Sequence, residues 1–513
     1  MKGFRFKITI IKYLLVFVPL IYFINNAIIF DKFTKWFVIR DSFDYVGLIA
    51  YMTAGLFLAI ALFSLFAHRY VIKLFSIFIV ISAAFATYFI LKYSIAIDSS
   101  MILNVFYTDT TQSTALLSVE MIPCILLLII LPIIVILRTE IIFDNPFTHI
   151  LKIIMIFIIS LLICLALIYS NFKLIHRAGG QSEKYMLYQL VPVNVLWAIG
   201  GIAEDYIKDN FLSKKKVKVK IEGKVLNDDD LVVVLAIGET SRQKSFSLYG
   251  YQKNTNPLLS KQKDLHTLNG IATYGSTIYA LPEILSRDDV KLPSITSAVG
   301  IQTSCFSNFQ LYGNCGTVNE VMVSNCGHDG ECYDEDVLPL LKEDLKSYKS
   351  GKRMVVLHFG GGSHGPIYSR RHPDEFLSFK PPCNYADVIN KCTLEELYNS
   401  FDNSILYVDY VVSNAIDVLE ASKVPYVFIF LSDHGESLLE DDRIFHGMPP
   451  GIALPKEQAE IPLLVKASVP ISVSKRKEYH QQDIYDTVLD LLSIDIDLLK
   501  KDKVFIKTKG VKP

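Results

Sequence analysis

The stretch that decides the fold is YVFIFLSDHGES at residues 426–437. Its first six residues are apolar without a break and rich in aromatic and β-branched side chains. This predicts a strand buried on both faces, as in a parallel sheet. Asp433 and His434 follow at once, on a turn that contains Gly435. Ligands bind just outside the carboxyl ends of the strands in open α/β sheets, and Asp and His both bind zinc. The alternative is a polar turn that closes a buried strand, because Asp and Gly are also common turn residues.

Two more segments of the same kind end in residues that bind metals. Residues 231–237, LVVVLAI, predict a second buried strand, which is followed by Glu239. Residues 354–357, MVVL, predict a third strand, which runs into His358 and then His364. Because the carboxyl ends of parallel strands meet at one edge of a sheet, we expect these side chains to lie together. The sequence therefore predicts an α/β domain with a central, mostly parallel sheet and a metal site for hydrolysis or group transfer.

The first third of the chain has the composition of a membrane domain. Five apolar stretches lack Asp, Glu, Lys and Arg, and each is about the length that a helix needs to cross a bilayer. They are Tyr13–Phe30, Val46–Ala67, Leu74–Leu91, Met121–Leu137 and Ile153–Ser170. A cleaved signal peptide accounts for the first of them at most. The alternative for all five is a set of buried helices in a large soluble protein.

The 513 residues are too many for one compact domain, and the composition changes along the chain. We expect a five-helix transmembrane domain at residues 1–170, interfacial helices and a linker at 171–220, and an external catalytic domain at 221–513. In the middle part, residues 185–197 and 202–211 mix apolar and polar side chains, which is typical of amphipathic helices on a membrane surface.

The distribution of Lys and Arg over the short loops predicts the orientation in the membrane. Four basic residues precede the first span, and the connection at 94–120 contains none. The first loop, with Lys32, Lys35 and Arg40, is the exception. The balance predicts a cytoplasmic N-terminus. An odd number of spans then places the chain after Ser170 outside the cytoplasm.

The cysteines agree with an external compartment. Two of the eight lie inside predicted spans, and the other six fall in the soluble half in close sequential pairs. This pattern is typical of short-loop disulfides, which persist in oxidising compartments. A zinc knuckle is the alternative, but no CxxC spacing is present.

Charge gives little further information about partners. The basic run KKKVKVK at 214–220 is interpreted as a solvated linker, with contact to anionic lipid headgroups as the alternative. The net charge of −1 gives no indication that the chain binds nucleic acid.

A zinc site that transfers a phosphoryl group needs carboxylate and imidazole ligands and one position for a nucleophile. Glu239, Asp433 and His434 supply the ligands. A hydroxyl near a helix N-terminus is a suitable nucleophile, because zinc activates it and backbone N–H groups stabilise the developing charge. An ordinary capping hydroxyl is the alternative at every such position. The residues alone leave four candidates: Ser241, Ser276, Thr277 and Thr296.

Four motifs make the chain similar to a known family, the membrane-bound phosphoethanolamine transferases that modify lipid A and lipooligosaccharide. They are GETSR at 238–242, SHGP at 363–366, SDHGESL at 432–438 and FHGMP at 445–449. Their order and spacing are those of the family, and the resemblance covers the whole chain. It implies a catalytic domain of the alkaline phosphatase and sulfatase type in the periplasm, anchored in the bacterial inner membrane.

The resemblance also selects the nucleophile and the metal ligands. The spacing of Pro282 behind Thr277 is that of the family's nucleophile. Carried over by position, Glu239, Thr277, Asp433 and His434 bind the catalytic zinc. Thr277 then attacks the phosphorus of phosphatidylethanolamine, releases diacylglycerol and holds phosphoethanolamine as a phosphothreonine. The acceptor, lipid A, displaces it.

Three further histidines match positions of the family. His364 and His446 match histidines that contact the phosphoryl group or a second zinc and serve in proton transfer. His358 matches a nearby histidine, without a definite role. The alternative for each of the three is a hydrogen-bonded structural residue.

A membrane loop carries a further match, which implies a site for the donor. Asn104, Thr108 and Gln112 recur at i, i+4 spacing and so share one face of a helix. The family has Asn, Thr and Glu there, and they help to bind the ethanolamine head group. With Gln112, the ammonium group loses a charged partner.

The resemblance implies three disulfides, Cys305–Cys315, Cys326–Cys332 and Cys383–Cys392. Relatives often bridge two more cysteines that flank the nucleophile. Thr273 and Glu283 stand in those places here.

Two other functions compete with this interpretation. A glycerol-phosphate transferase of the lipoteichoic acid synthase type shares the five spans and the threonine nucleophile, but the motifs and the paired cysteines argue against it. A non-catalytic membrane receptor with an enzyme-like external domain is expected to have lost ligands, and all the proposed ligands are present.

The acceptor remains open between lipid A and other envelope molecules, such as glycans or a periplasmic protein. Transfer to lipid A adds amines and weakens the attraction of cationic antimicrobial peptides.

Overall fold

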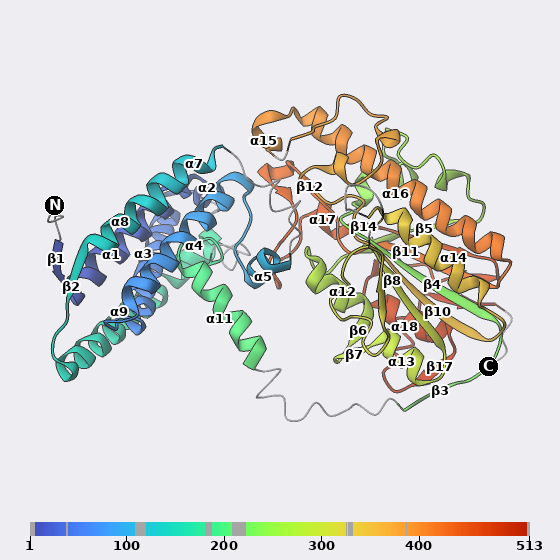
Figure 1. Ribbon diagram of the computed structural model, residues 1–513, viewed down its shortest axis with the longest axis horizontal. Helices are drawn as coiled ribbons and strands as arrows, with labels where there is room; N and C mark the ends of the chain where they lie inside the picture. The colour runs from blue at the N-terminus through green and yellow to red at the C-terminus, as the bar shows by residue number, and fades with distance from the viewer. Residues whose placement is uncertain are drawn as a thin grey trace. The chain divides into compact units, whose positions relative to one another are not determined.

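The computed structural model describes residues 6–36, 39–107, 119–179, 187–207, 222–324, 326, 332–385 and 387–509. The chain forms two compact units (Figure 1). The membrane unit comprises Met1–Ser213 with Gly451–Ala453, and the sheet unit comprises Lys214–Pro450 with Leu454–Pro513. The basic run at 214–220 lies outside the described residues.

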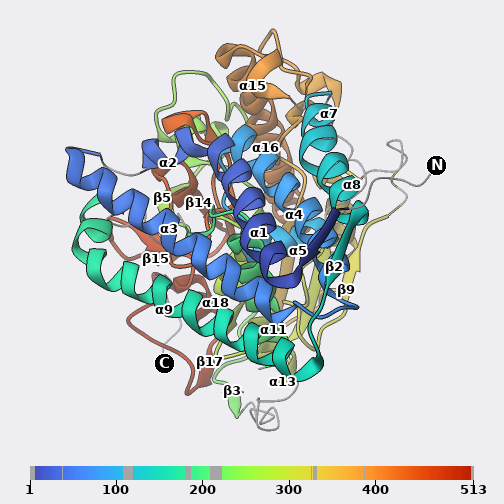
Figure 2. The same cartoon turned by 90° about the vertical axis from the view of Figure 1, so that its left-hand side faces the viewer.

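Among the described residues, five helices of the membrane unit are long and apolar enough to cross a bilayer, as the composition predicts (Figure 2). They are α1 (Ile10–Ile28), α3 (Ser42–Leu65), α4 (Ile72–Tyr93), a continuous helix over Met121–Arg138, and α9 (Pro146–Gly179). The fourth consists of α7 (Met121–Cys124), a π-helical segment (Ile125–Ile130) and α8 (Leu131–Arg138). Each predicted span overlaps one of these helices. The last helix is longer than its apolar stretch at both ends.

The fourth and fifth of these helices present apolar side chains outward. Only 11% of the most apolar part of each is buried within the protein, and Leu127 and Leu162 are more than half exposed. An apolar surface of this kind is unfavourable in water and favourable in the hydrocarbon core of a bilayer. The inner sides of α1, α3 and α4 instead form a packed core that includes Tyr13, Phe63 and Ile79.

Shorter elements complete the membrane unit. They are α2 (Phe30–Trp36), α5 (Ser99–Tyr107), α11 (Val193–Ile207) and the parallel pair β1 (Phe6–Thr9) and β2 (Thr139–Ile142). One helix, α11, spans parts of both segments for which the sequence predicts interfacial helices.

An eight-stranded sheet forms the centre of the sheet unit, in the order β16-β5-β14-β11-β4-β10-β8-β9. Seven strands run in one direction, and β14 alone is antiparallel to its neighbours. The prediction of a mostly parallel sheet is therefore confirmed. The strands are β4 (Leu231–Gly238), β5 (His266–Ile271), β8 (Gln302–Ser307), β9 (Glu320–Met322), β10 (Lys352–Phe359), β11 (Tyr426–Ser432), β14 (Glu460–Ala467) and β16 (Tyr479–His480).

The three strands that the sequence predicts are neighbours at the centre of this sheet. Strand β4 lies between β11 and β10 and is parallel to both. Every residue of β4 and of β11 is buried. Helices cover both faces of the sheet, and this explains why these strands are continuous apolar runs without alternation.

Helices α12 (Thr277–Leu285), α13 (Leu292–Ala298) and α18 (Asp483–Leu491) pack on one face of the sheet (Figure 1). Leu281 of α12 and Ile484 of α18 share a hydrophobic core with Val233 and Leu235 of β4. The other face carries α14 (Leu338–Lys346) and α16 (Leu394–Ser422). A capping box of Thr393 and Glu396 begins α16.

Short elements form the turns and edges around the sheet. Four two-stranded pairs are antiparallel: β3 (Gly223–Val225) with β17 (Ile494–Ile496), β6 (Ser286–Arg287) with β7 (Val290–Lys291), β12 (Ser437–Leu438) with β13 (Ile444–Phe445), and β15 (Ile471–Val473) with β18 (Ile506–Thr508). Helices α15 (Val388–Lys391) and α17 (Lys456–Ala459) are single turns.

Candidate metal centre

The carboxyl ends of β4 and β11 bring acidic and imidazole side chains to one place. The last residue of β4, Gly238, pairs with the last residue of β11, Ser432. Glu239 therefore follows one strand where Asp433 and His434 follow its neighbour. The backbone N–H of Asp433 donates to the carbonyl of Gly238 at 2.9 Å, which fixes the register of the two turns.

Thr277 approaches the same point from a helix. It is the first residue of α12, and its Oγ1 lies 3.1 Å from both carboxylate oxygens of Glu239. The same Oγ1 lies 3.5 Å from Nε2 of His434. Nε2 of His434 is in turn 3.6 Å from Oε1 of Glu239 and 3.3 Å from Oδ2 of Asp433. Three oxygen-bearing side chains and one imidazole thus converge.

One carboxylate oxygen of Asp433 accepts no hydrogen bond in the described part of the chain. Its Oδ1 accepts hydrogen bonds from the N–H groups of Thr240 and His434, at 3.0 and 2.7 Å. Its Oδ2 is buried, lies 3.3 Å from Nε2 of His434, and forms no hydrogen bond with any residue that the structure describes. A buried carboxylate oxygen without a partner is unfavourable unless a cation or a proton satisfies it.

The histidines of the centre all use Nδ1 for a hydrogen bond. Nδ1 of His434 lies 3.1 Å from the carbonyl of Gly435, and Nδ1 of His364 lies 2.8 Å from the carbonyl of Gly365. A carbonyl accepts only, so in both rings Nδ1 carries the proton and Nε2 keeps its lone pair. A backbone acceptor of this kind orients metal-binding histidines and fixes their tautomer.

This donor set fits a zinc ion. Carboxylate oxygen, hydroxyl oxygen and imidazole nitrogen are zinc ligands, and four of them suffice for a tetrahedral site. Burial, and after it the charge of Asp433, raise the pKa of Glu239 well above its ordinary value. A divalent cation removes that penalty, because it stabilises the two neighbouring carboxylates in their charged form.

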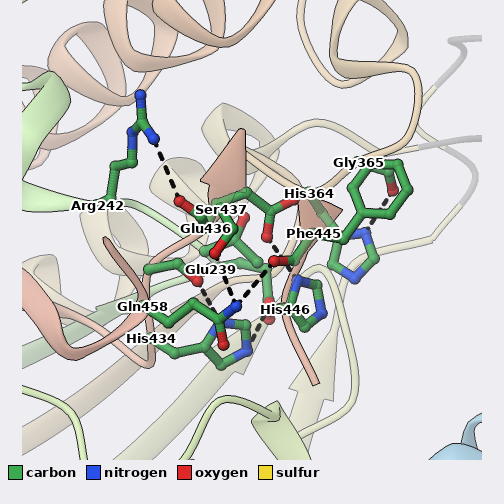
Figure 3. Close-up of polar contacts among 12 residues, drawn as sticks. Glu239, Arg242, His364, Gly365, His434, Glu436, Ser437, Phe445, His446 and Gln458 are labelled. Atoms are coloured by element: carbon green, nitrogen blue, oxygen red, sulfur yellow. Dashed lines mark hydrogen bonds and ion pairs between the residues drawn. The ribbon is translucent and has the colours of Figure 1, made fainter. Parts of the chain in front are cut away.

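His446 lies next to these residues and has its own carboxylate partner. The rings of His434 and His446 have centroids 4.4 Å apart, and one ligand atom each of Glu239, His434 and His446 lie within 4.8 Å of one another (Figure 3). Nδ1 of His446 is 2.6 Å from Oε2 of Glu436. The hydroxyl of Tyr368 donates to the other oxygen of Glu436 at 2.9 Å.

His364 completes a group of three imidazoles. Its ring centroid is 5.0 Å from that of His446. Burial lowers the pKa of both His364 and His446 well below the ordinary value, and the neighbouring histidines add to the effect. Both rings are therefore neutral at neutral pH and are able to accept a proton or bind a metal ion through Nε2.

A buried aspartate holds the glycine-rich loop that carries His364. Asp334 accepts hydrogen bonds from the N–H groups of Gly361 and Gly362, both at 2.9 Å. A Cβ on either glycine would lie 3.0 or 3.1 Å from the Asp334 carboxylate, so side chains do not fit there without a shift. His358, at the end of β10, is buried and has Nδ1 at 3.0 Å from the carbonyl of Phe309.

The other hydroxyls that the sequence leaves open have different partners. Ser276 is the N-cap residue of α12 and forms no side-chain cap bond. Thr296 bonds to Pro293 and Thr303, and Ser241 to Ser363. Among these candidates, Thr277 alone contacts the Glu239 carboxylate through its hydroxyl in the described part of the chain.

The donor residues of the membrane loop are not placed by the structure. Asn104 lies in α5, but its side chain lies outside the described part of the chain, as do Thr108 and Gln112 entirely.

The structure describes the six cysteines of the sheet unit and also Thr273 and Glu283, which flank Thr277. Cys305–Cys315, Cys326–Cys332 and Cys383–Cys392 are bonded, and these are the pairs that the resemblance implies. Where relatives have a fourth bridge, the hydroxyl of Thr273 donates to Oε1 of Glu283 at 3.4 Å.

Sequence reasoning missed three residues that act at this centre. Glu436 lies inside the SDHGESL motif, and its place two residues after His434 was the only available signal. Asp334 has no local pattern, because its partners lie 27 and 28 residues away. Arg242 closes the GETSR motif, and nothing in its local sequence indicates a role apart from that motif.

Comparisons with known proteins agree with these observations. A family model described as Phosphoethanolamine transferase EptA/EptB matches residues 56–207, and one described as Sulfatase matches residues 232–494. The chain is 31% identical over 469 residues to phosphoethanolamine transferase EptA of Helicobacter pylori, across 85% of this chain and 84% of that protein. It is 26% identical over 481 residues to the Kdo(2)-lipid A phosphoethanolamine 7''-transferase of Escherichia coli, across 86% and 84%.

The fold has a solved counterpart over its full length. The integral membrane protein lipooligosaccharide phosphoethanolamine transferase A from Neisseria meningitidis is similar with a TM-score of 0.82. The alignment covers 97% of this chain and 98% of that chain, at 24% identity. The combination of a helical membrane unit with an alkaline phosphatase-like sheet unit is therefore shared.

Proposed function

This chain belongs to the phosphoethanolamine transferases of the alkaline phosphatase superfamily, and from that membership we propose that it moves phosphoethanolamine from phosphatidylethanolamine to lipid A. One observation carries the proposal. The Thr277 hydroxyl, at the N-terminus of α12, lies 3.1 Å from both oxygens of Glu239 and 3.5 Å from Nε2 of His434. A hydroxyl so placed is a nucleophile beside a set of zinc ligands.

The first half of the reaction loads Thr277. Its Oγ1 attacks the phosphorus of phosphatidylethanolamine, the bond from phosphorus to the glycerol oxygen breaks, and diacylglycerol leaves. The proton that Thr277 loses balances the proton that the glycerol oxygen gains. Nε2 of His364 or of His446 carries it, because both rings are neutral and their Nδ1 atoms are already engaged.

The second half of the reaction unloads Thr277. A phosphate oxygen of lipid A attacks the phosphorus of the phosphothreonine and forms a new bond to it, the bond from Oγ1 to phosphorus breaks, and Oγ1 takes up the proton that the attacking phosphate group loses. The N-terminus of α12 directs backbone N–H groups at this phosphoryl group, which stabilises negative charge there in both halves. The relative from Escherichia coli whose name specifies Kdo(2)-lipid A supports an acceptor of this class.

Glu239, Thr277, Asp433 and His434 would hold a zinc ion in this proposal. Bound zinc supplies a Lewis acid that lowers the pKa of the threonine hydroxyl and neutralises the phosphoryl oxygens. The unpartnered, buried Oδ2 of Asp433 supports this assignment. His364 and His446 would hold a second zinc if one binds.

The membrane unit would supply the donor lipid. Five apolar helices place the chain in a bilayer, and the head group of phosphatidylethanolamine would be bound through Asn104, Thr108 and Gln112. The N-terminus would lie in the cytoplasm of a bacterial inner membrane and the sheet unit in the periplasm, with domains at 1–170, 171–220 and 221–513. Three disulfides in the sheet unit support an oxidising compartment.

Purified full-length protein in vesicles of phosphatidylethanolamine tests the proposal. Without acceptor, the expected result is a phosphoethanolamine adduct on Thr277, identified by peptide mass spectrometry, with release of diacylglycerol. Addition of lipid A should discharge the adduct and yield modified lipid A. Thr277→Ala should abolish the adduct, whereas Thr296→Ala, which removes a hydroxyl bonded elsewhere, should retain it. No adduct in these vesicles, with transfer of glycerol phosphate to the acceptor in vesicles of phosphatidylglycerol, would contradict the proposal.

A further inference from the structure

Arg242 is a charged side chain that the proposed reaction does not use. It closes the GETSR motif three residues after Glu239 and is among the largest fully buried side chains of the chain. Burying a guanidinium is unfavourable unless it is paired and hydrogen-bonded. Its contacts therefore indicate what this charge holds in place.

The guanidinium of Arg242 reaches the segment that follows Asp433 and His434, after the end of β11. Its Nη1 donates to Oε1 of Glu440 at 2.7 Å. The same Nη1 donates to the backbone carbonyl of Glu436 at 3.4 Å, and Figure 3 shows both of these residues. Its Nε donates to the hydroxyl of Ser245 at 2.8 Å. One side chain thus joins the turn after β4 to the turn after β11.

Glu440 extends this connection into the same turn. Its second oxygen accepts the N–H of Leu438 at 2.5 Å, and its first accepts the hydroxyl of Tyr398 at 2.9 Å. The guanidinium carbon of Arg242 lies 5.1 Å from the ring centroids of Tyr398 and Phe401, both on α16. The aromatic rings and the carboxylate together determine where the guanidinium sits.

The segment that follows β11 is tightly packed at Gly435. A Cβ on Gly435 would lie 3.1 Å from Cβ of Arg242 and 2.1 Å from the carbonyl oxygen of Glu457. The backbone at Gly435, next to Glu436, therefore packs closely against both Arg242 and Glu457.

Glu436 is the residue whose carboxylate orients His446. Oε2 of Glu436 lies 2.6 Å from Nδ1 of His446, and the backbone carbonyl of the same glutamate accepts from Arg242. We infer that Arg242, paired with Glu440, is a positioning residue that holds Glu436 and, through it, the ring of His446. This inference rests on the proposed function, in which His446 acts on the phosphoryl group.

A second buried ion pair supplies a matched control. Arg353 and Asp344 are 3.0 Å apart, with side chains 4% and 7% exposed. Arg353 is the second residue of β10, so it lies at the amino ends of the parallel strands, at the opposite edge from the centre. Loss of either ion pair should affect folding, whereas only the loss of Arg242 should affect the position of His446.

The test measures diacylglycerol release by purified full-length variants in vesicles that contain phosphatidylethanolamine. For Arg242→Met we expect kcat to fall about 100-fold with KM changed less than about threefold, because a displacement of about 1 Å in an active site has effects of this size. The kcat of Arg242→Lys should be about tenfold higher than that of Arg242→Met. Arg353→Met should lower the melting temperature while kcat stays within about twofold of the wild type.

A double substitution separates positioning from general damage. In a His446→Ala background, Arg242→Met should lower kcat less than about threefold further, because the group through which it acts is already absent. A further fall of about 100-fold in that background would overturn the inference, as would an unchanged kcat for Arg242→Met alone. If Arg242→Met does not fold, Tyr398→Phe, which removes one hydroxyl from Glu440, should give a smaller fall of the same kind.

The proposed function can fail separately from this inference. If the wild-type protein releases no diacylglycerol and forms no adduct on Thr277, the proposed function is wrong, whatever the variants do. If the wild type is active and Arg242→Met is as active, only the role of Arg242 is wrong.

Discussion

Nδ1 of His446 lies 2.6 Å from Oε2 of Glu436, and the ring of His446 lies 5.0 Å, centroid to centroid, from that of His364. The other oxygen of Glu436 accepts the hydroxyl of Tyr368, which is fully buried. Each oxygen of the carboxylate thus has one definite partner. This arrangement engages Nδ1 of His446 and so orients its ring beside the proposed zinc ligands.

Replacing this carboxylate should impair catalysis without removing a proposed metal ligand. We expect Glu436→Gln to lower kcat about 10- to 100-fold, the usual range for a residue that orients a metal-site histidine. Glu343→Gln is the control, since Glu343 is an exposed residue of α14 with its side chain 74% exposed, and it should leave kcat unchanged. Equal activity of Glu436→Gln and the wild type would show that His446 needs no such partner.

Removal of the unpartnered carboxylate should reduce metal binding. Asp433→Asn retains the acceptor for the N–H groups of Thr240 and His434 and loses the negative charge of Oδ2. We expect purified Asp433→Asn to contain less than about half of the wild-type zinc by elemental analysis, because zinc prefers a charged carboxylate ligand. A chelator should lower the melting temperature of the wild type and have less effect on the variant. Full zinc content in Asp433→Asn would contradict the assignment.

The parts of the centre that lie on regular elements could be predicted from the sequence. Glu239 and Asp433 each come directly after a fully buried strand, and the direction of parallel strands decides where both side chains gather. The fold class and the five spans follow from apolar runs for the same reason, because burial on all sides leaves a continuous pattern.

Long-range placement explains what sequence reasoning could not reach. Thr277 follows β5, and two strands, β14 and β11, separate β5 from β4 in the sheet. No sequence periodicity predicts that strand order, so the residues alone do not distinguish four candidate hydroxyls, and only the family resemblance selects one of them. Asp334 and Arg242 act from turns on partners far along the chain, and a turn residue carries no pattern that names its partner.

Asp334 should stabilise the glycine-rich loop. Its carboxylate satisfies the buried N–H groups of Gly361 and Gly362 and the side chain of Asn308. Asp334→Ala leaves these donors without an acceptor, and each unsatisfied buried group is unfavourable by about 1–3 kcal/mol. We expect a lower melting temperature and faster hydrogen exchange at both glycines, measured by mass spectrometry. Protection unchanged from the wild type would show that the loop is held by other contacts.

The pair of Arg242 and Glu440 should make stability depend on acidic pH. Burial alone would raise the pKa of Glu440, but the charge of Arg242 and the hydrogen bonds from Leu438 and Tyr398 together outweigh it, and the pKa falls from 4.5 to about 2. A depressed carboxyl pKa contributes stability that is complete above the unfolded value of 4.5 and is lost as the pH falls towards 2. The contribution is on the order of 3 kcal/mol for a side chain that is 17% exposed. Glu440→Gln should therefore melt lower than the wild type at pH 6 and approach it below pH ~3. Parallel melting curves across this range would contradict the shift.

The two residues that flank Thr277 offer a site for an engineered disulfide. Oγ1 of Thr273 and Oε1 of Glu283 are 3.4 Å apart, so their side chains already face each other across the start of α12. The loop between them is ten residues long by sequence separation, and closing a loop of about this length in the unfolded chain stabilises a protein by roughly 2–3 kcal/mol. We expect Thr273→Cys/Glu283→Cys to form the bridge in oxidising conditions and to melt higher than the same variant after reduction.

Each single cysteine variant is the control, and neither should respond to reduction at this position. Diacylglycerol release should stay within about threefold of the wild type, since the bridge holds the N-terminus of α12 near its present place. Free thiols at both positions after oxidation, measured by mass spectrometry of alkylated peptides, would show that the two segments are farther apart than the hydrogen bond implies.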